Sequence, residues 1–206
     1  FYNLSRNQKI IEIVNRLLGG SVRFHHCKLN FKLPSKSGGE VAWHQDWAFY
    51  PHTNDDLITV GIYLEDCKEE NGPLQVMPGS HKKKIFNHHN SKKEFIGKIS
   101  QRINMKSKKS LMGLAGTVTF HHVRMIHGSG LNLTNNRRPL ILFGYANTDA
   151  WPLTADASIN PNENFKKYND CIIKGKIKLT PRFEKVPVII PLPKNNVSIY
   201  QLQKKV

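Results

Sequence analysis

The sequence lacks the features of a membrane protein and of a disulfide-stabilised secreted scaffold. None of its apolar runs approaches the roughly 20 residues of a membrane-spanning helix, and residues 1–4 lead into a polar helical pattern with no signal-peptide character. The three cysteines are widely spaced and odd in number, which fits neither a disulfide framework nor a zinc knuckle. We therefore expect a protein of a reducing compartment, the cytoplasm.

Acidic residues are also scarce. The chain has 15 Asp and Glu against 31 Lys and Arg, a formal charge of +16. Such a surplus can attract nucleic acid, an anionic membrane or an anionic substrate. The lysines are spread over short clusters without interleaved aromatic residues, unlike a nucleic-acid platform. We therefore expect solvated lysines on loops and no nucleic-acid partner, and we keep an anionic substrate as the alternative explanation.

Hydrophobic patterning predicts one mainly β domain with flanking helices over residues 1–206. Apolar residues recur at helical spacing from Ile10 to Leu18, after a capping box at residues 5–8. A second capping box at residues 91–94 predicts a short amphipathic helix within 91–103. Strands are expected at residues 22–33, 57–64, 74–77, 117–122, 125–129, 139–146 and 186–190. Many short strands favour a sandwich or jelly roll.

A candidate metal site is formed by three residues. His44 and Asp46 are two apart, so on an extended segment their side chains lie on the same side. His127, from a distant strand, can supply a second imidazole. Two histidines and one carboxylate on one face of non-haem Fe(II) leave positions open for substrate and oxygen. A His-x-Asp pair alone is a weak signal, because the chain contains ten histidines.

Three blocks give this pattern its specificity. They are AWHQDWAFYPHTNDDLITVGIYLED from Ala42, NGPLQVMPGSHK from Asn71 and GTVTFHHVRMIHGSGLNLTNNRRPLILFGYANTDAWPL from Gly116. Together they resemble the phytanoyl-CoA dioxygenase family of Fe(II)/2-oxoglutarate oxygenases. The resemblance is strongest to the branch of phytanoyl-CoA dioxygenase domain-containing proteins. The resemblance implies a double-stranded β-helix, the jelly roll of the cupins, with Fe(II), 2-oxoglutarate and O2 as cofactor and cosubstrates. Family members carry several dozen further residues before the iron motif, so we expect an N-terminal segment to be missing here.

The cosubstrate also needs a cation for its second carboxylate, and arginine suits this because its planar fork binds a carboxylate through two hydrogen bonds. Arg137 and Arg138 are adjacent, and on a strand only one can point inward. The resemblance selects Arg138, eleven residues after the distal histidine. Ser129 shares the face of His127 and can add a hydrogen bond. In the closest relatives the position of Leu29 forms an apolar wall of the cosubstrate pocket.

The resemblance implies hydroxylation of a small-molecule or acyl substrate with release of succinate and CO2. Trp47, Tyr50 and His52 follow the first two ligands and are candidate walls of the substrate pocket, although core packing explains the aromatics equally well. We expect the basic connection 87–110 to lie over or beside the open side of the barrel. The alternatives are a non-catalytic jelly-roll binding protein and a basic nucleic-acid-associated protein.

The remaining histidines are not expected to bind the metal. Neighbouring residues on a strand point to opposite faces, so an adjacent pair cannot chelate with both members. This applies to the pairs His25-His26, His88-His89 and His121-His122.

Overall fold

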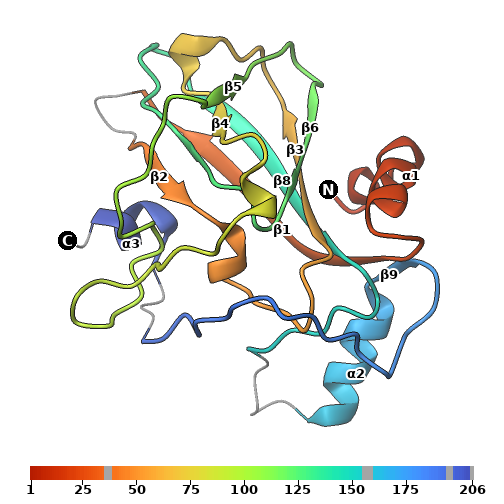
Figure 1. The fold of residues 1–206 in the computed structure, drawn as a ribbon. Helices are drawn as coiled ribbons and strands as arrows, with labels where there is room; N and C mark the ends of the chain where they lie inside the picture. The colour runs from red at the N-terminus through yellow and green to blue at the C-terminus, as the bar shows by residue number, and fades with distance from the viewer. Residues whose placement is uncertain (35–38, 155–159, 194–196, 205–206) are drawn as a thin grey trace.

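The computed structural model describes residues 1–34, 39–154, 160–193 and 197–204. Two antiparallel sheets face each other, one with strand order β6-β3-β8-β1-β9 and one with order β2-β7-β4-β5 (Figure 1). The strands are β1 Val22–Lys32, β2 Val41–His44, β3 Leu57–Tyr63, β4 Leu74–Val76, β5 Lys109–Leu111, β6 Val118–His122, β7 His127–Ser129, β8 Arg138–Ala146 and β9 Ile172–Lys174. This arrangement confirms the predicted mainly β jelly roll.

Helices flank the two sheets. They are α1 Gln8–Leu17, α2 Pro161–Asp170 and α3 Ile199–Lys204, with the 3-10 helices η1 Leu4–Arg6, η2 Asp46–Ala48, η3 Glu69–Asn71 and η4 Ser80–Lys82. The predicted first helix is confirmed, but its cap differs from the expected one. The side chain of Asn7 accepts hydrogen bonds from the backbone N–H groups of Lys9 and Ile10, whereas the Ser5 hydroxyl donates to the Tyr2 carbonyl.

The hydrophobic core lies on the outer face of the five-stranded sheet, beneath α1. The strands β3 and β8 alternate, so every second side chain faces this core. Its buried members are Ile10, Ile11, Val14, Leu18, Val22, Ile58, Val60, Ile62, Ile141, Phe143 and Tyr145. The other side chains of the same strands point into the space between the sheets. One sheet therefore serves both the core and the cavity.

Two predicted elements are absent. Residues 186–190 form no strand, because Pro187 cannot donate a ladder hydrogen bond; Val186 and Val188 pack against a second core cluster. Residues 91–103 form no helix. There the Asn90 side chain accepts from the backbone N–H groups of Lys92 and Glu94 and holds the chain in a turn.

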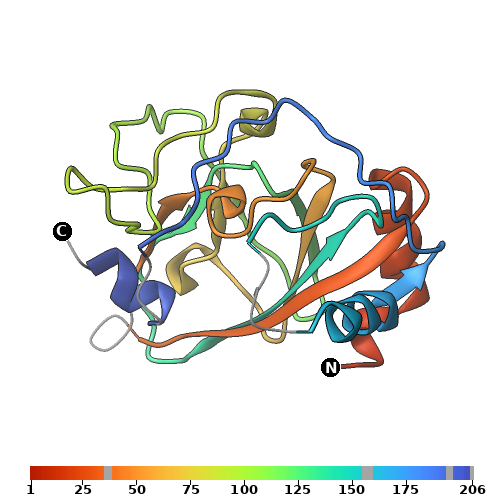
Figure 2. The same ribbon diagram turned by 90° about the horizontal axis from the view of Figure 1, so that it is seen from below.

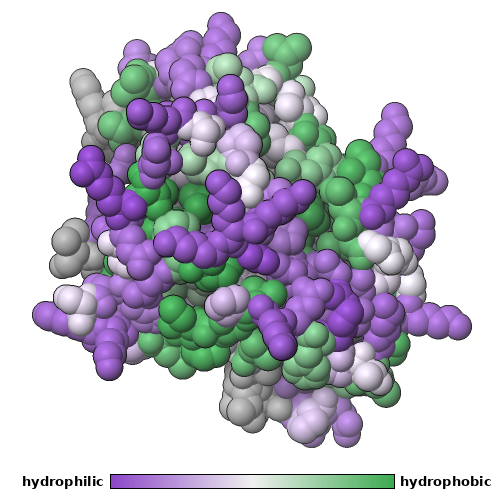
Figure 3. Space-filling model, in the orientation of Figure 1, coloured by the Kyte–Doolittle hydropathy of each residue, from purple (hydrophilic) through white to green (hydrophobic). Residues whose placement is uncertain are grey.

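On the face drawn in Figure 3, hydrophilic side chains are spread over most of the surface with apolar patches between them. The three thiols are free, with Cys27 exposed and Cys67 buried. Within the described residues, no helix has the length and apolar character needed to cross a membrane.

Candidate active site

The three predicted ligands converge at the meeting point of short elements. His44 ends β2, Asp46 begins η2 and His127 begins β7, and the two histidines are paired across the β2–β7 ladder. Nε2 of each histidine lies 3.7 Å from Oδ1 of Asp46. One ligand atom from each residue lies within 4.8 Å of the others, and all three residues are buried. Three donors at this spacing could hold one metal ion.

Hydrogen bonds orient each of these side chains. Nδ1 of His44 lies 2.8 Å from the Ala42 carbonyl oxygen, and Nδ1 of His127 lies 2.9 Å from that of Met125. Because a carbonyl only accepts, Nδ1 carries the proton in both rings and Nε2 keeps its lone pair for a metal. The Thr59 hydroxyl donates to Oδ2 of Asp46 at 3.0 Å. Oδ1 is thereby left for the metal.

The electrostatics keep the ligands in their metal-binding protonation states. Burial lowers the pKa of His127 to about 4, and burial with the nearby His127 lowers that of His44 well below its usual value. Burial alone would raise the pKa of Asp46, but His127, His121 and His44 outweigh it and hold this pKa well below its usual range. Both imidazoles are therefore neutral and the carboxylate is charged at neutral pH.

His121 is a site residue that the sequence analysis missed. Its Nε2 lies 3.7 Å from Oδ2 of Asp46, and its ring centre is 4.6 Å from that of His127. Both of its ring nitrogens are buried without a hydrogen-bond partner among the described residues. His121 pairs with Thr59 across the β3–β6 ladder, so the two residues flank the same carboxylate oxygen. The register between β3 and β6 is what brings His121 beside Asp46. That register cannot be read from the sequence alone.

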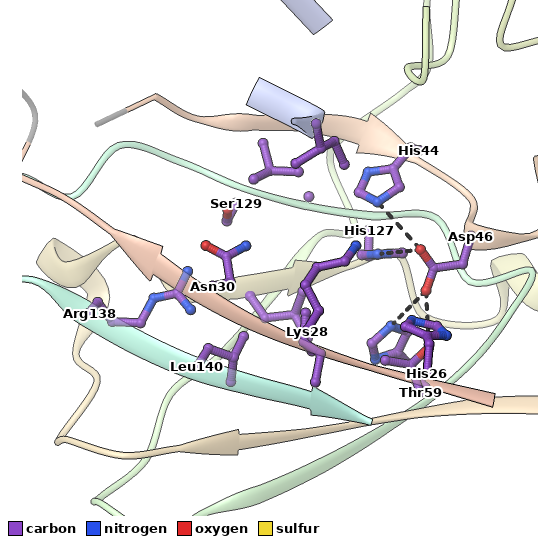
Figure 4. A pocket seen from close by; sticks show the side chains of 16 residues that line it. His26, Lys28, Asn30, His44, Asp46, Thr59, His127, Ser129, Arg138 and Leu140 are labelled. Carbon is purple, nitrogen blue, oxygen red and sulfur yellow. Dashed lines mark hydrogen bonds and ion pairs between the residues drawn. The ribbon is translucent and has the colours of Figure 1, made fainter. Parts of the chain in front are cut away.

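A cavity extends from the triad into the space between the sheets. Arg138 lies at its far end, with Ser129 and Leu140 along the way and Lys28 between the two ends (Figure 4). Arg138 is only 2% exposed. One of its nitrogens, Nη2, donates to the Gly72 carbonyl at 3.3 Å, whereas Nε and Nη1 are buried without a hydrogen-bond partner among the described residues. A buried guanidinium with two unused donors fits a ligand carboxylate.

Arg137 has the opposite orientation. It is exposed, and its guanidinium lies 5.5 Å from the centre of the Phe31 ring. Strand parity predicted that one of the two arginines points inward, and the family resemblance selected Arg138. The structure places Arg138 inward and Arg137 outward.

Lys32 is a second buried cation near Arg138, and the sequence analysis did not single it out. The two residues are partners across the β1–β8 ladder. The ammonium of Lys32 donates to the carbonyls of Gly130 at 2.7 Å and Gly39 at 3.1 Å. Burial, together with the charge of Arg138, lowers the pKa of Lys32 to about 8. Two buried cations are thus neighbours on β1 and β8, and of the two Arg138 lines the cavity.

Three of the predicted pocket residues lie elsewhere. Leu29 is on the outer face of β1 and packs against the α1 core, so the predicted wall is instead made by Leu140 and Leu142. The expectation was wrong because odd-numbered residues in this part of β1 face outward. Trp47 is 1% exposed in a core cluster and donates to the Pro187 carbonyl. His52 is 1% exposed and contacts Arg23.

A second pocket adjoins the triad, and Tyr50 does line it. Its walls are His25, His26, Lys28, Asp46, Phe49, Tyr50 and Ile199. Burial and the nearby Asp46 carboxylate raise the pKa of Tyr50 well above its ordinary value. Ile199, the first residue of α3, lines both this pocket and the cavity. A segment from the end of the chain therefore contributes a wall of the site.

The connection 87–110 lies beside the metal-ligand side of the barrel. Its residue Phe95 packs on Phe49, whose ring centre is 5.5 Å from that of His44. The Ile99 backbone N–H donates to the Trp43 carbonyl at 2.9 Å. Figures 1 and 2 show this connection next to α3, and Gln203 of α3 donates to the Gly97 carbonyl at 2.7 Å. The connection thus lies next to the strand that carries His44, and its predicted role as a cover of the open side stays a prediction.

Comparison with known proteins agrees with this geometry. A "Probable alpha-ketoglutarate-dependent hypophosphite dioxygenase" of Stutzerimonas stutzeri is 42% identical over 197 residues, covering 93% of this chain and 66% of that protein. An L-proline trans-4-hydroxylase of Streptomyces griseoviridis is 32% identical, covering 73% of this chain and 65% of that protein. The chain thus spans slightly less than two thirds of the length of these relatives.

Structure and family comparisons point the same way. The solved structure of the non-heme monooxygenase ThoJ superposes with a TM-score of 0.65 at 23% identity, covering 87% of this chain and 62% of that one, which shows a shared fold. Residues 2–140 match the model of the phytanoyl-CoA dioxygenase (PhyH) family. With the triad and the jelly roll in place, the chain belongs to the phytanoyl-CoA dioxygenase family.

Proposed function

We propose that this chain is the catalytic domain of an Fe(II)- and 2-oxoglutarate-dependent dioxygenase that hydroxylates a small molecule. His44, Asp46 and His127 hold the metal. One observation carries the proposal: a single cavity joins three oriented metal donors to a buried arginine, Arg138, that has two unused donors. A binding protein without turnover would gain nothing from this combination.

The residues fit both the metal and the cosubstrate. Two neutral imidazoles and one carboxylate suit Fe(II), and a buried anion requires a paired cation, which Arg138 provides. The Ser129 hydroxyl lies in the same cavity and can donate to the cosubstrate. The bound metal and 2-oxoglutarate supply the oxidation, in which one oxygen atom of O2 enters the substrate and the other enters succinate as CO2 leaves. The chain orients the reactants and excludes water.

We further propose a small anionic substrate, with hypophosphite as the first compound to test. The relative that shares 42% identity over nearly the whole chain is named for hypophosphite. Oxidation would convert one P–H bond into P–OH, giving phosphite, and the two electrons lost by phosphorus together with the two lost by 2-oxoglutarate reduce O2. The surplus of basic residues favours an anion over a neutral substrate. The free thiols suit a reducing, cytoplasmic setting in which iron stays ferrous.

The test is substrate-dependent succinate formation. The protein is first loaded with Fe(II) under anaerobic conditions. It then receives 2-oxoglutarate, O2 and one candidate substrate, which is hypophosphite, L-proline or ectoine. Relatives of this chain are named for these three compounds. We expect succinate to form in a fixed ratio to oxidised hypophosphite, and Asp46→Ala to abolish this. An Asp46→Ala protein with full iron-dependent turnover would refute the metal assignment. No succinate with any substrate in the presence of bound metal would favour a binding protein.

A further inference from the structure

Beside the metal donors, β1 presents a polar face that the proposed reaction has so far not used. His26, Lys28, Asn30 and Lys32 recur at every second position and point between the sheets, whereas Leu29 faces the core. Asn30 interacts with the hydroxyl of Tyr200 from α3, and Lys32 is held by two carbonyls. Lys28 has no such contact among the described residues, and the contact of His26 is with its neighbour His25.

We propose that Lys28 and His26 form the binding subsite for an oxyanion next to the metal, and that this oxyanion is the substrate. The inference rests on the function proposed above and assigns its substrate recognition to named residues. Lys28 lines both the cavity that holds Arg138 and the adjoining pocket with His25 and Tyr50. Its ammonium extends toward His127 and Asp46 in Figure 4.

The side chain of Lys28 is exposed, and its ammonium is not held in place by a partner in the described part of the protein. No hydrogen bond or ion pair connects it to any residue that the structure describes. The ammonium instead reaches a region in which several imidazoles and Arg138 accompany one carboxylate, that of Asp46. An exposed ammonium that lines this pocket beside neutral imidazoles can attract and contact an anion.

The formal charges of the loaded site lead to the same conclusion. Lys32, at the far end, is offset in part by Glu40. The remaining positive charges are two on the metal and one each on Arg138 and Lys28. The negative charges are one on Asp46 and two on 2-oxoglutarate. Even without Lys32, one positive charge therefore remains unbalanced, and a monoanion such as hypophosphite would neutralise it.

His26 can add a directed hydrogen bond. Its Nδ1 lies 2.8 Å from Nδ1 of His25, so one ring donates to the other. When His25 donates, His26 carries its proton on Nε2 and can offer it to an oxyanion. The ring can occupy this place because residue 144 on β8 is a glycine: a Cβ there would lie 2.5 Å from two of its ring atoms.

The remaining walls limit the size of the occupant. Phe49 and Ile199 are apolar and partly buried, and they line the same pocket as the two basic residues. Phe49 is supported from behind by Phe95, and a Cβ on Gly97 would lie 3.0 Å from its ring. A small oxyanion with an apolar P–H or C–H group would meet both kinds of wall.

The experiment is calorimetric titration of hypophosphite, and separately of inorganic phosphite, into protein loaded with Ni(II) and 2-oxoglutarate. Ni(II) prevents turnover, so binding is measured by itself. We expect Lys28→Met to weaken hypophosphite binding on the order of tenfold to a hundredfold while changing the Kd of 2-oxoglutarate less than twofold. Lys28→Arg should keep most of the affinity. The matched control is Lys9→Met, which removes the same charge from the exposed face of α1 and should bind as the wild type does.

The outcomes separate this inference from the proposed function. Wild-type protein that fails to bind 2-oxoglutarate with Ni(II) would overturn both. Wild-type protein that binds 2-oxoglutarate but no oxyanion would overturn the subsite alone. Equal hypophosphite affinity in Lys28→Met and Lys9→Met would also overturn it. A Lys28→Met protein that loses 2-oxoglutarate instead of hypophosphite would show that Lys28 serves the cosubstrate. Because 2-oxoglutarate binding is measured in every variant, a misfolded protein is recognised directly.

Discussion

Replacing Arg138 should show whether this buried cation serves ligand binding or the stability of the fold. Arg138 is 2% exposed and donates one hydrogen bond, 3.3 Å long, to the Gly72 carbonyl, while Nε and Nη1 have no partner. Its guanidinium is 5.9 Å from the centre of the Tyr63 ring. Taking an ion out of water costs several kcal/mol, and these contacts offset only part of that cost. In the free protein Arg138 is therefore expected to lower stability.

Arg138→Met keeps most of the side-chain volume and removes the charge. We expect the variant without 2-oxoglutarate to unfold at the same temperature as the wild type or higher, since a buried ion is replaced by an apolar chain. Binding of 2-oxoglutarate should weaken by about 2–5 kcal/mol, which is roughly thirtyfold to several thousandfold in Kd. Metal binding should be nearly unchanged, because none of the three donors is altered.

Thermal unfolding with Mn(II), with and without 2-oxoglutarate, measures both effects. At a hundredfold excess over its Kd the cosubstrate should stabilise the wild type by about 2.7 kcal/mol, and Arg138→Met should lose most of this stabilisation. Arg137→Met is the control, because Arg137 is exposed and lies over Phe31. If Arg138→Met is much less stable without 2-oxoglutarate, or keeps the full stabilisation, the electrostatic reasoning is wrong.

Three further predictions follow from burial, position and strand parity. Burial lowers the pKa of His52 to about 3 and that of His88 to about 4. In the unfolded chain these two histidines take up protons below about pH 6.5, so each should lower the free energy of unfolding by roughly 1.4 kcal/mol per pH unit as the pH falls toward 4. A urea midpoint that does not fall from pH 7 to pH 4.5 would contradict this. Hydrogen exchange over residues 92–109 should be faster than in the strands and should slow once metal, 2-oxoglutarate and hypophosphite are bound. Unchanged protection would contradict the expectation that this connection covers the site. Leu29→Ala should lower the free energy of unfolding by about 1–2 kcal/mol without changing the Kd of 2-oxoglutarate, whereas Leu140→Ala should raise that Kd, and the reverse result would restore Leu29 to the pocket.

The metal-ligand triad was predictable because local spacing and short blocks encode it. His44 and Asp46 are two residues apart, and the Gly-Ser continuation distinguishes His127 from the other histidines. Most long strands were predictable too, since buried strands show as apolar runs. The elements missed were short or polar. β2 has four residues, and α2 is almost entirely polar apart from Phe165 and Tyr168.

The sequence could not supply what depends on strand register. Whether Leu29 or Lys28 faces the metal is decided by a one-residue shift in β1, and an irregularity between Phe24 and His26 sets that shift. The contribution of Ile199 depends on the position of α3, about 70 residues after His127 in the chain. Both facts are tertiary, and neither leaves a local pattern.

The pairing of Lys32 with Arg138 makes cosubstrate binding sensitive to pH. The pKa of Lys32 is lowered to about 8 by burial and by the charge of Arg138, so near pH 8 about half of the free protein carries a neutral Lys32. A bound carboxylate beside Arg138 would favour the charged form and raise this pKa. Binding of 2-oxoglutarate should therefore take up a fraction of a proton at pH 8 and little at pH 6.5, where Lys32 is already charged.

Calorimetric titration of 2-oxoglutarate in two buffers of different ionisation enthalpy measures this uptake. Lys32→Met should abolish it, while Lys9→Met, a change of equal charge on α1, should not. As the pH rises from 7 to 9 the affinity of the wild type should fall, because the loss of the Lys32 charge removes an attraction for the dianion. Proton release on binding, or an affinity that rises over this range, would show that the two cations do not act together on the cosubstrate.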